Sequence, residues 1–499
     1  MGKGKRTDFM KKYNLLVVGL GKTGVSVIKK VSDLCSSIIA VDDNPYLDLE
    51  LAFGGSQYKE INNLKIMPGR DFIDGQKILK KIDLVIISPG VPSNAPLIKN
   101  ARENGIPVWS ELELAWRLLQ EEEQKRTIAV TGTNGKTTVV TLIGEIIKNS
   151  GKNCVVCGNV GLPLINTIDT NEVNIINNDK TSSNYSIDRE LIRVIEVSSF
   201  QLEWVYEFKP HISVILNITS DHIDRHRSFD DYARLKLKLF ENQSAGDRAI
   251  FNADDPNIES RVNRCISTGY KKLPEFIKYS LKTKEGVNLF YEDEAVFYRI
   301  DNKKGKVNIK NSPLKGNHNI SNIMASIAPS LLMGVDERNI EETIKNFKPL
   351  DHRLEYLGCV KKIRCFNDSK STNPDATLAA LEDFDKEVTL IMGGKNKNMD
   401  FSELISILNK KIKNLILIGE AAPVIYESIS ESGFDYKIFR CRTLEEAVYR
   451  GFEVAKPGEV LMLSPACASM DMFKDYKERG DRFKSLVCME KERVSTGKN

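Results

Sequence analysis

The sequence predicts an α/β protein that folds as three domains in series. Two glycine turns, near residues 19 and 132, each follow an apolar strand and precede an apolar helix, and strand and helix patterns alternate again after residue 349. Each pattern is typical of a parallel-sheet unit that binds nucleotides. A chain of 499 residues is also too long for one core. We expect a Rossmann-like N-terminal domain at 1–122, a P-loop ATPase central domain at 123–348 and a Rossmann-like C-terminal domain at 349–499.

The first glycine turn has the form Gly-Leu-Gly-Lys-Thr-Gly and begins at Gly19. An apolar strand precedes it at 14–19, and a helix leads from it to a second strand that ends at Asp42. This arrangement is the fingerprint of a dinucleotide-binding unit. On these residues alone, a NAD-binding redox or sensor protein stays open. We expect a further strand at 84–87, a closing helix at 109–119 and a linker at 121–126.

The second glycine turn is a candidate phosphate cradle. Gly132 and Gly135 let the backbone curl so that successive N–H groups point at a polyphosphate, and Lys136 adds a cation for the β- and γ-phosphates. Thr137 offers a hydroxyl to Mg²⁺. The general P-loop pattern would have its first glycine at Val130, so the match is to a shorter variant. The alternative is an ordinary turn between a strand and a helix.

Three polar residues after this turn could carry chemistry. Glu196 lies in the apolar strand predicted at 192–197, where a carboxylate is costly to bury unless it is paired or binds a metal ion. Its alternative is an edge-strand glutamate that faces water. His222 follows the end of the next strand and could bind a metal ion or serve a structural role. Lys236 lies on a helix predicted at 232–240, where a solvated lysine is the ordinary interpretation.

Composition argues against several classes of protein. The 72 basic and 68 acidic residues leave a net charge of +4, no face is polybasic, and no apolar run is long enough to be a signal peptide or a membrane span. We therefore expect no nucleic-acid partner, no membrane association and no secretion. Nine cysteines, an odd number, fit a reducing cytoplasm. Cys154 and Cys157 form a C-x-x-C pair, for which buried thiols and a redox or zinc role are the alternatives.

Seven motifs occur in order along nearly the whole chain. They are Gly-Thr-Asn-Gly-Lys-Thr-Thr (132–138), Gly-Asn-Val-Gly-Leu-Pro (158–163), Glu-Val-Ser-Ser-Phe-Gln-Leu (196–202), Leu-Asn-Ile-Thr-Ser-Asp-His-Ile-Asp-Arg (216–225), Gly-Asn-His-Asn-Ile-Ser-Asn-Ile-Met-Ala (316–325), Asp-His-Arg (351–353) and Asn-Asp-Ser-Lys-Ser-Thr-Asn (367–373). This series resembles the Mur ligases, the ATP-dependent enzymes that add amino acids in peptidoglycan synthesis. Within that family, Leu-Ser-Pro-Ala-Cys-Ala-Ser-Met-Asp at 463–471 and the turn at Gly19 look most like the branch that adds D-glutamate.

The resemblance implies a reaction, its cofactors and its partners. ATP would phosphorylate the alanyl carboxylate of UDP-N-acetylmuramoyl-L-alanine, and the amine of D-glutamate would attack the resulting acyl phosphate. Lys136, Arg353 and two Mg²⁺ ions would neutralise the anions that these steps bring together. We expect a monomeric cytoplasmic enzyme. Because its domains are joined by short linkers, we also expect an open-to-closed movement.

The resemblance also assigns residues. The catalytic residues would be Lys136, His222, Lys236 and Arg353. The nucleotide would be bound by Gly132, Thr133, Asn134, Gly135, Lys136, Thr137, Thr138, Asn319, Asn322, Arg353 and Asp368. Mg²⁺ would be held by Thr137, Glu196, His222 and Lys236, the last as a carbamate. Lys22, Thr23, Asp42 and Ser88 would bind the uridine diphosphate, and Asn159 would position the substrate. D-Glutamate would be held by Lys370, Thr372, Lys397, Ser469 and Tyr476.

Two other ligases remain as alternatives. Folylpolyglutamate synthetase shares the P-loop and C-terminal domains, but its P-loop lies close to the N-terminus, whereas here a complete glycine-turn domain precedes Gly132. The Mur ligase that adds meso-diaminopimelate or lysine is disfavoured by Ala-Cys-Ala-Ser-Met-Asp at 466–471. One position departs from the family pattern, since Lys395 stands where an acidic residue is common.

Overall fold

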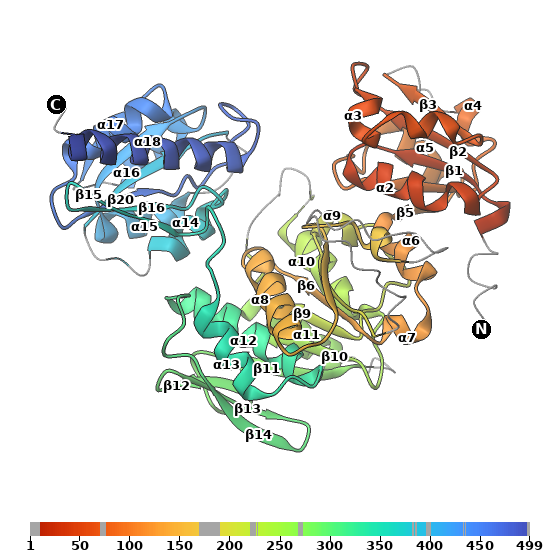
Figure 1. Cartoon of the computed structure of the whole chain (residues 1–499), viewed down its shortest axis with the longest axis horizontal. Coiled ribbons are helices and arrows are strands. Elements are labelled where there is room, and N and C mark those ends of the chain that lie inside the picture. The colour runs from red at the N-terminus through yellow and green to blue at the C-terminus, as the bar shows by residue number, and fades with distance from the viewer. Residues whose placement is uncertain are drawn as a thin grey trace. The chain divides into compact units, whose positions relative to one another are not determined.

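The computed structural model describes residues 10–69, 76–168, 190–219, 226, 228–267, 273–381, 384, 387–395, 401–432, 434 and 436–496. Contacts divide the chain into two compact units. The first unit comprises 1–218, 230–310 and 321–345, and the second comprises 219–229, 311–320 and 346–499. Two β-sheets lie in the first unit and a third lies in the second (Figure 1). The predicted α/β class is confirmed, and the three domain boundaries stay predictions.

The N-terminal sheet is parallel and has the strand order β3-β2-β1-β4-β5. This order places a switch point between β1 and β4, where the carboxyl ends of the strands form the ligand-binding edge of such folds. The strands expected at 14–19, before Asp42 and at 84–87 are confirmed as β1, β2 and β4. The elements are η1 (Met10–Lys12), β1 (Asn14–Val18), α2 (Lys22–Val31), η2 (Ser32–Leu34), β2 (Ser37–Asp42), α3 (Leu49–Phe53), η3 (Ser56–Glu60), β3 (Leu64–Pro68), α4 (Gln76–Leu79), β4 (Leu84–Ile87), α5 (Pro96–Glu103), β5 (Val108–Ser110) and α6 (Glu111–Leu118).

The central sheet has the order β14-β13-β12-β11-β10-β9-β6-β8-β7. Its strands are parallel from β7 to β12, and β12, β13 and β14 continue it in antiparallel pairing. Strand β6, which leads into the second glycine turn, lies between β8 and β9, so these three strands end beside one another. The elements are α7 (Glu121–Gln124), β6 (Thr127–Thr131), α8 (Lys136–Asn149), β7 (Cys154–Gly158), η4 (Leu164–Thr167), β8 (Ile192–Glu196), α9 (Ser199–Leu202), β9 (Ile212–Ile215), α10 (Phe229–Glu241), β10 (Arg248–Asn252), α11 (Pro256–Ser267), β11 (Glu275–Ser280), β12 (Leu289–Glu292), β13 (Ala295–Ile300), β14 (Lys303–Asn308), α12 (Asn317–Leu332) and α13 (Glu337–Asn346).

The C-terminal sheet has the order β15-β16-β20-β17-β18-β19, and its strands are parallel except for β15, which pairs antiparallel with β16. Both faces are covered: Leu390 and Met392 pack into one apolar cluster, whereas Ile391 packs into another. Burial on both faces explains why β17 is apolar except for Thr389. The elements are β15 (Glu355–Val360), β16 (Ile363–Asn367), α14 (Pro374–Leu381), β17 (Val388–Gly393), α15 (Ser402–Lys411), β18 (Ile412–Ile418), α16 (Ala422–Ser432), β19 (Lys437–Arg440), α17 (Leu444–Val454), β20 (Val460–Leu463) and α18 (Tyr476–Thr496).

Two local expectations differ from the structure. The helix expected at 109–119 begins only at Glu111, because the two residues before it complete β5. Ser110 then caps α6 by accepting a hydrogen bond from Glu113 N at 3.3 Å. The linker expected at 121–126 contains the short helix α7, whose start is stabilised by a hydrogen bond from Gln120 N to the Glu123 carboxylate at 2.9 Å. Among the helices of the described ranges, none has the length and apolar character that crossing a membrane requires.

Candidate functional site

The second glycine turn connects β6 to α8. Gly135 has a φ of +84°, in the left-handed region that favours glycine. Asn217, just after β9, holds the turn: its carbonyl accepts from Thr133 N at 2.9 Å and its side-chain oxygen accepts from Asn134 N at 2.8 Å. The turn is therefore preorganised at the N-terminus of a helix of 14 residues. A helix attracts anions at this end, because its first N–H groups lack partners within the helix.

Two lysines converge on the carbonyl oxygen of Gly132. Lys136 Nζ donates to it at 2.7 Å and also donates to Thr133 O at 2.7 Å. Lys236 Nζ, from α10, donates to the same Gly132 oxygen at 2.8 Å. Lys236 is only 1% exposed, and its ammonium lies 4.5 Å from the centre of the Tyr232 ring. The ordinary interpretation of Lys236 as a solvated lysine is therefore wrong.

Glu196 ends β8, an interior strand of the central sheet. The alternative of an edge-strand glutamate that faces water is thus wrong, and the residue is 3% exposed. Its Oε1 accepts a hydrogen bond from Asn159 Nδ2 at 2.8 Å, but within the part of the chain that the structure describes its buried Oε2 has no hydrogen-bond partner. A buried carboxylate oxygen without a partner carries a desolvation cost. A bound cation would remove that cost.

A hard divalent cation fits these residues. Such a cation prefers oxygen ligands, and Mg²⁺ in particular is usually bound by one or two carboxylates together with substrate phosphates. Glu196 supplies the carboxylate, and Thr137 is the second residue of α8, directly after the second glycine turn, which is the candidate phosphate cradle. In the part of the chain that the structure describes, no three His, Cys, Asp or Glu side chains cluster. His222 lies outside the described residues, so its predicted role stays a prediction.

Helix α12 brings Asn322 to the phosphate turn. A Cβ added to Gly135 would lie 2.3 Å from Asn322 Oδ1, so the asparagine side chain occupies the space that a larger residue would need. Asn322 is 7% exposed. Asn319 lies one helical turn earlier, and its Nδ2 donates to Lys315 O at 2.8 Å. Thr138 is buried within α8. Their predicted contacts with a nucleotide stay predictions.

The first glycine turn is tied to the ends of two neighbouring strands. The carboxylate of Asp42, at the end of β2, accepts from Leu20 N at 2.7 Å, and Ser88 Oγ, just after β4, donates to Gly19 O at 2.8 Å. A Cβ added to Gly24 would lie 1.9 Å from Gly19 O, so helix α2 can approach the turn this closely only with glycine there. Asp42 and Ser88 thus shape the predicted uridine diphosphate site.

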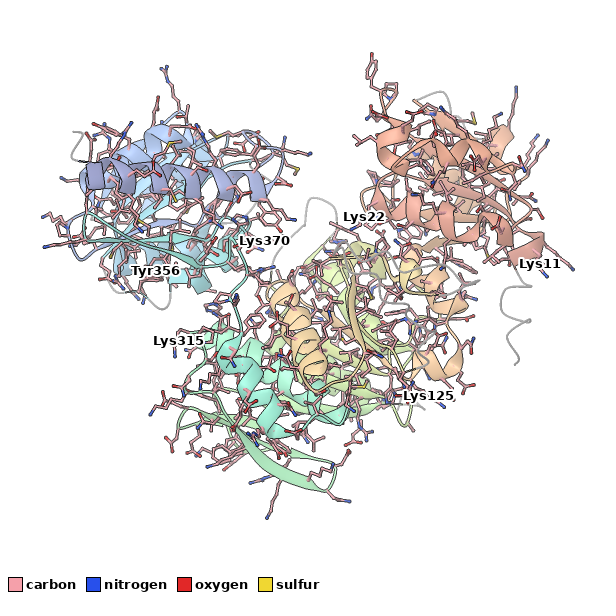
Figure 2. All side chains as sticks on the ribbon, viewed as in Figure 1. Lys11, Lys22, Lys125, Lys315, Tyr356 and Lys370 are labelled. Atoms are coloured by element: carbon pink, nitrogen blue, oxygen red, sulfur yellow. The ribbon has the colours of Figure 1, made fainter. Side chains whose placement is uncertain are left out.

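Lys22 and Thr23 begin helix α2 at the same edge. The Lys22 ammonium donates to the carbonyl oxygen of Gly161, in the loop that follows β7 (Figure 2). Asn159 in that loop is exposed, although its side chain donates to Glu196. The first unit therefore brings the predicted substrate residues Lys22 and Asn159 to one loop.

In the second unit, the buried side chain of Asp368 connects several segments of the chain by hydrogen bonds. Its carboxylate accepts from Leu354 N at 3.0 Å, from Ser464 Oγ at 2.7 Å and from Ser371 Oγ. Burial raises the pKa of Asp368 to about 6, although these hydrogen bonds and the nearby Arg353 partly oppose the shift. Asp368 is 5% exposed. The residue thus holds the loop that carries Arg353, and its predicted contact with a nucleotide stays a prediction.

The predicted D-glutamate residues of the second unit lie on three neighbouring segments. Lys370 Nζ lies 3.8 Å from the centre of the Tyr476 ring, at the start of α18 (Figure 2). Thr372 is partly buried, and Ser469 is 3% exposed. Lys395 N donates to Ala468 O at 2.8 Å, which brings β17 beside the Ser469 segment. Lys397 lies outside the described residues.

Arg479 is a central residue that sequence reasoning missed. It is 1% exposed, and its guanidinium donates to Ser369 Oγ at 3.0 Å, to Ser369 O at 2.9 Å and to Cys467 O at 3.0 Å. Burial lowers its pKa to about 10. It therefore joins the segments that carry Lys370 and Ser469. An arginine in a helix rich in charged residues is ordinarily interpreted as solvated. Arg479 follows Tyr476 by three residues and therefore lies on the same helix face, and only this spacing could have indicated that its side chain points inward.

The C-x-x-C pair does not form a redox or zinc site in the structure. Both thiols are free, and their spacing along β7 directs them to opposite faces of the sheet. Burial raises the pKa of Cys154 to about 12 and raises that of Cys157 as well. Thiols with raised pKa values react slowly, which supports the interpretation as buried thiols.

Comparison with known families assigns three consecutive segments. Residues 13–110 match "Mur ligase MurD-like, N-terminal domain", residues 130–329 match "Mur ligase middle domain", and residues 352–467 match "Mur ligase, glutamate ligase domain". Individual relatives match over nearly the whole chain. A protein of Thermoanaerobacter pseudethanolicus named UDP-N-acetylmuramoylalanine--D-glutamate ligase is 36% identical over 96% of this chain and 99% of its own. A protein of Clostridioides difficile with the same name is 35% identical over 96% and 99%.

Solved structures share the fold. A protein named MurF from Acinetobacter baumannii matches with a TM-score of 0.56 and 15% identity over 96% of this chain and 90% of its own. The MurF ligase from Thermotoga maritima, solved in complex with ADP, matches with a TM-score of 0.55 and 15% identity over 99% and 97%. At this level of identity the likeness extends to the fold alone.

Proposed function

Because the chain belongs to the Mur ligase family, we propose that it joins D-glutamate to UDP-N-acetylmuramoyl-L-alanine with ATP and Mg²⁺. Relatives that carry the name of this activity, at 35% and 36% identity over 96% of the chain, support the choice of substrates. The bond to be made is an amide between the alanyl carboxyl group and the amine of D-glutamate. A carboxylate is a poor electrophile at neutral pH, so it needs activation.

One observation carries the proposed reaction type. The second glycine turn begins just after Val130, which pairs with Glu196 in the sheet, and the buried Oε2 of Glu196 has no hydrogen-bond partner among the described residues. A polyphosphate cradle next to an unsatisfied carboxylate oxygen is the arrangement that a metal–nucleotide complex requires. A NAD-binding sensor would need neither feature in its second domain.

In the first step, the alanyl carboxylate attacks the γ-phosphorus of ATP, the bond to the bridging oxygen breaks and ADP leaves. Lys136 and the N-terminus of α8 are assigned to the β- and γ-phosphates, where they offset the charge that develops during transfer. We assign the same role to Arg353, which would also offset the charge that develops during phosphate transfer. Bound Mg²⁺ would add further neutralisation and orient the phosphates. Thr137, Glu196, His222 and carbamylated Lys236 are the proposed ligands.

Carbamylation of Lys236 would relieve a conflict of charge. Two ammonium groups donate to one oxygen, that of Gly132, and like charges so close repel each other. Adding CO₂ to the Lys236 amine replaces a cation with a carboxylate-like anion. Its oxygens suit a hard cation that an ammonium would repel.

In the second step, the amine of D-glutamate attacks the acyl carbon, phosphate leaves and the amine loses a proton. The pocket must hold two carboxylates and leave the amine free. Lys397 and Thr372 are assigned to one carboxylate, with Lys370 nearby, and Ser469 and the Tyr476 backbone are assigned to the other. A basic amino acid would be repelled by the positive charge of the pocket lysines. A small neutral amino acid would leave the pocket's hydrogen-bond donors without partners.

The uridine diphosphate is assigned to the first glycine turn. Lys22, Thr23, Asp42 and Ser88 lie at the carboxyl edge of the N-terminal sheet, where folds of this order bind nucleotides. Asn159 is assigned to the muramoyl part of the substrate. Nucleotide contacts are assigned to Asn319, Asn322 and Asp368.

The decisive experiment measures phosphate release from ATP with Mg²⁺ and UDP-N-acetylmuramoyl-L-alanine. D-Glutamate, L-glutamate, L-lysine, meso-diaminopimelate and L-alanine are offered in turn. Release that occurs only with D-glutamate supports the proposal, and a preference for another amino acid moves the assignment to another branch of the family. Saturable NADH binding without any phosphate release would contradict the ligase assignment.

The proposal includes a cytoplasmic location and a monomeric state. The nine cysteines all lie within the described residues and form no disulfide, as is usual in a reducing compartment. Sedimentation of the purified protein tests the monomer, and fractionation of cells tests the location.

A further inference from the structure

One short segment links the first glycine-turn domain to the candidate metal carboxylate. We call residues 158–167 the bridging segment. At its start, Asn159 contacts Glu196 twice, since the Asn159 side chain donates to the carboxylate at 2.8 Å and the Asn159 backbone N donates to Glu196 O at 2.9 Å. At its end, Thr167 is held by the buried Arg193, whose Nε donates to Thr167 Oγ1 at 3.0 Å.

The bridging segment is compact, so a displacement at one end would reach the other. Gly158 N donates to Leu162 O at 2.7 Å, and Asn166 N donates to Pro163 O at 3.1 Å. Gly161 has a φ of +72°, and a Cβ there would lie 2.9 Å from a backbone oxygen. The chain therefore has little freedom between Asn159 and its last residues.

Glu111, which lies outside this segment, contacts it near its end at Ile165. It is the first residue of α6 and is 2% exposed, and its Oε1 accepts a hydrogen bond from Ile165 N at 2.6 Å. Burial raises the pKa of Glu111 to about 7, which the hydrogen bond from Ile165 partly opposes. A buried carboxylate destabilises a fold unless its contacts offset the cost, and an apolar residue would pack here without that cost. Packing alone therefore does not explain why a carboxylate occupies this position.

We propose that Glu111 is a positioning residue, which holds Ile165 and thereby keeps the bridging segment in the conformation that places Asn159 on Glu196. The consequence for Mg²⁺ rests on the proposed function, because it requires Glu196 to be a metal ligand. The placement of the segment does not depend on that function.

Hydrogen exchange tests the placement directly. In Glu111→Ala, amides of the bridging segment should exchange at least about tenfold faster, because the hydrogen bond from Ile165 N to the Glu111 carboxyl group is lost. Glu111→Asp should act in the same direction, since its shorter side chain cannot reach Ile165. Glu111→Gln should stay close to the wild type, because an amide oxygen can accept the same hydrogen bond.

A matched control lies on the same helix. Glu113 is fully buried and accepts hydrogen bonds from the backbone N of Tyr206, Glu207 and Phe208. Glu113→Ala should speed exchange near residues 206–208, because these hydrogen bonds are lost, and should leave the bridging segment unchanged. Equal exchange of the bridging segment in Glu111→Ala and wild type would overturn the proposal.

Metal binding tests the consequence separately from activity. Mn²⁺, titrated by electron paramagnetic resonance in the presence of a non-hydrolysable ATP analogue, should bind about tenfold more weakly to Glu111→Ala than to wild type or Glu111→Gln. The KM for D-glutamate should not change. Faster exchange with unchanged Mn²⁺ binding would overturn the link to Glu196. Failure of the proposed function would appear differently, as wild-type protein that releases no phosphate with D-glutamate.

Discussion

Lys136 and Lys236 donate hydrogen bonds to the same carbonyl oxygen, that of Gly132. Lys236 thus lies at the second glycine turn, where a substitution tests its proposed role as a metal ligand. Lys236→Ala should lower turnover by two or more orders of magnitude, because the proposed carbamate ligand is lost. Bicarbonate or a short carboxylic acid should restore part of the rate by filling the space with a carboxylate. Phosphate release measures both effects.

The control for Lys236→Ala lies on the same helix. The side chain of Arg234 is 74% exposed, so Arg234→Ala should leave the rate unchanged. Near-normal turnover in Lys236→Ala would refute the carbamate assignment.

A substitution of Glu196 should affect catalysis and stability differently. Glu196→Gln should lower turnover by at least about 100-fold, because the proposed metal carboxylate is lost. Thermal unfolding should occur at the same temperature or higher, because the change removes a buried charge with an unsatisfied oxygen. Glu203 is a matched control, since its Oε2 is also buried and has no hydrogen-bond partner among the residues that the structure describes. If Glu203→Gln lost as much activity as Glu196→Gln, the special role of Glu196 would be disproved.

Asp368 makes stability depend on pH. Burial raises its pKa to about 6, whereas an unfolded aspartate titrates near ~3.9. The folded protein therefore binds this proton more tightly than the unfolded chain does. Its contribution to stability is fully present below about pH 4 and is lost as pH rises through 6, a change of roughly 3 kcal/mol.

Asp368→Asn should remove this pH dependence. Urea unfolding at pH 5 and pH 8 measures it, and the drop in stability between the two should be smaller in the variant than in wild type. Asp481, whose side chain is 68% exposed, provides the control, and Asp481→Asn should keep the wild-type drop. An unchanged drop in Asp368→Asn would show that another group causes it.

The turn between β1 and α2 depends on one close approach. A Cβ at Gly24 would lie 1.9 Å from Gly19 O, whereas a Cβ at Gly21 would have no neighbour within 4 Å. Gly24→Ala should therefore destabilise the N-terminal domain by about 1–3 kcal/mol, because helix and turn must separate. Gly21→Ala should cause no comparable loss. Thermal unfolding of both variants measures the difference, and equal unfolding temperatures would contradict the packing argument.

Local patterns predicted the elements that carry the motifs. The strands at β1, β4, β6 and β8 follow from short apolar runs that end at glycine or polar residues, so neighbouring residues alone determine them. The antiparallel extension from β12 to β14 was not predicted, because its strands have mixed polar and apolar residues and no chemical motif. Register in such strands depends on partners that are distant in sequence.

Buried charges were the main failure of prediction within the site. Glu111, Arg193 and Arg479 are each at most 3% exposed, yet charged residues in helices and strands ordinarily indicate a solvated face. Their partners include backbone groups far along the chain, such as Ile165 N and Ser369 O. A pattern of neighbouring residues holds no information about such contacts. The resemblance to a family supplied the proposed ligands, but not the residues that hold them in place.

The proposed nucleotide residues are divided between the two compact units, and this division predicts a movement. Lys136 and Asn322 belong to the first unit, whereas Arg353 and Asp368 belong to the second. If all four contact one ATP molecule, the units must close around it during the reaction. A non-hydrolysable ATP analogue and UDP-N-acetylmuramoyl-L-alanine together should therefore reduce the radius of gyration measured by X-ray scattering. Either ligand alone should have a smaller effect, because neither engages all three domains. Scattering profiles that stay the same with both ligands bound would contradict the movement, and the assignments of Arg353 and Asp368 to ATP would have to be withdrawn.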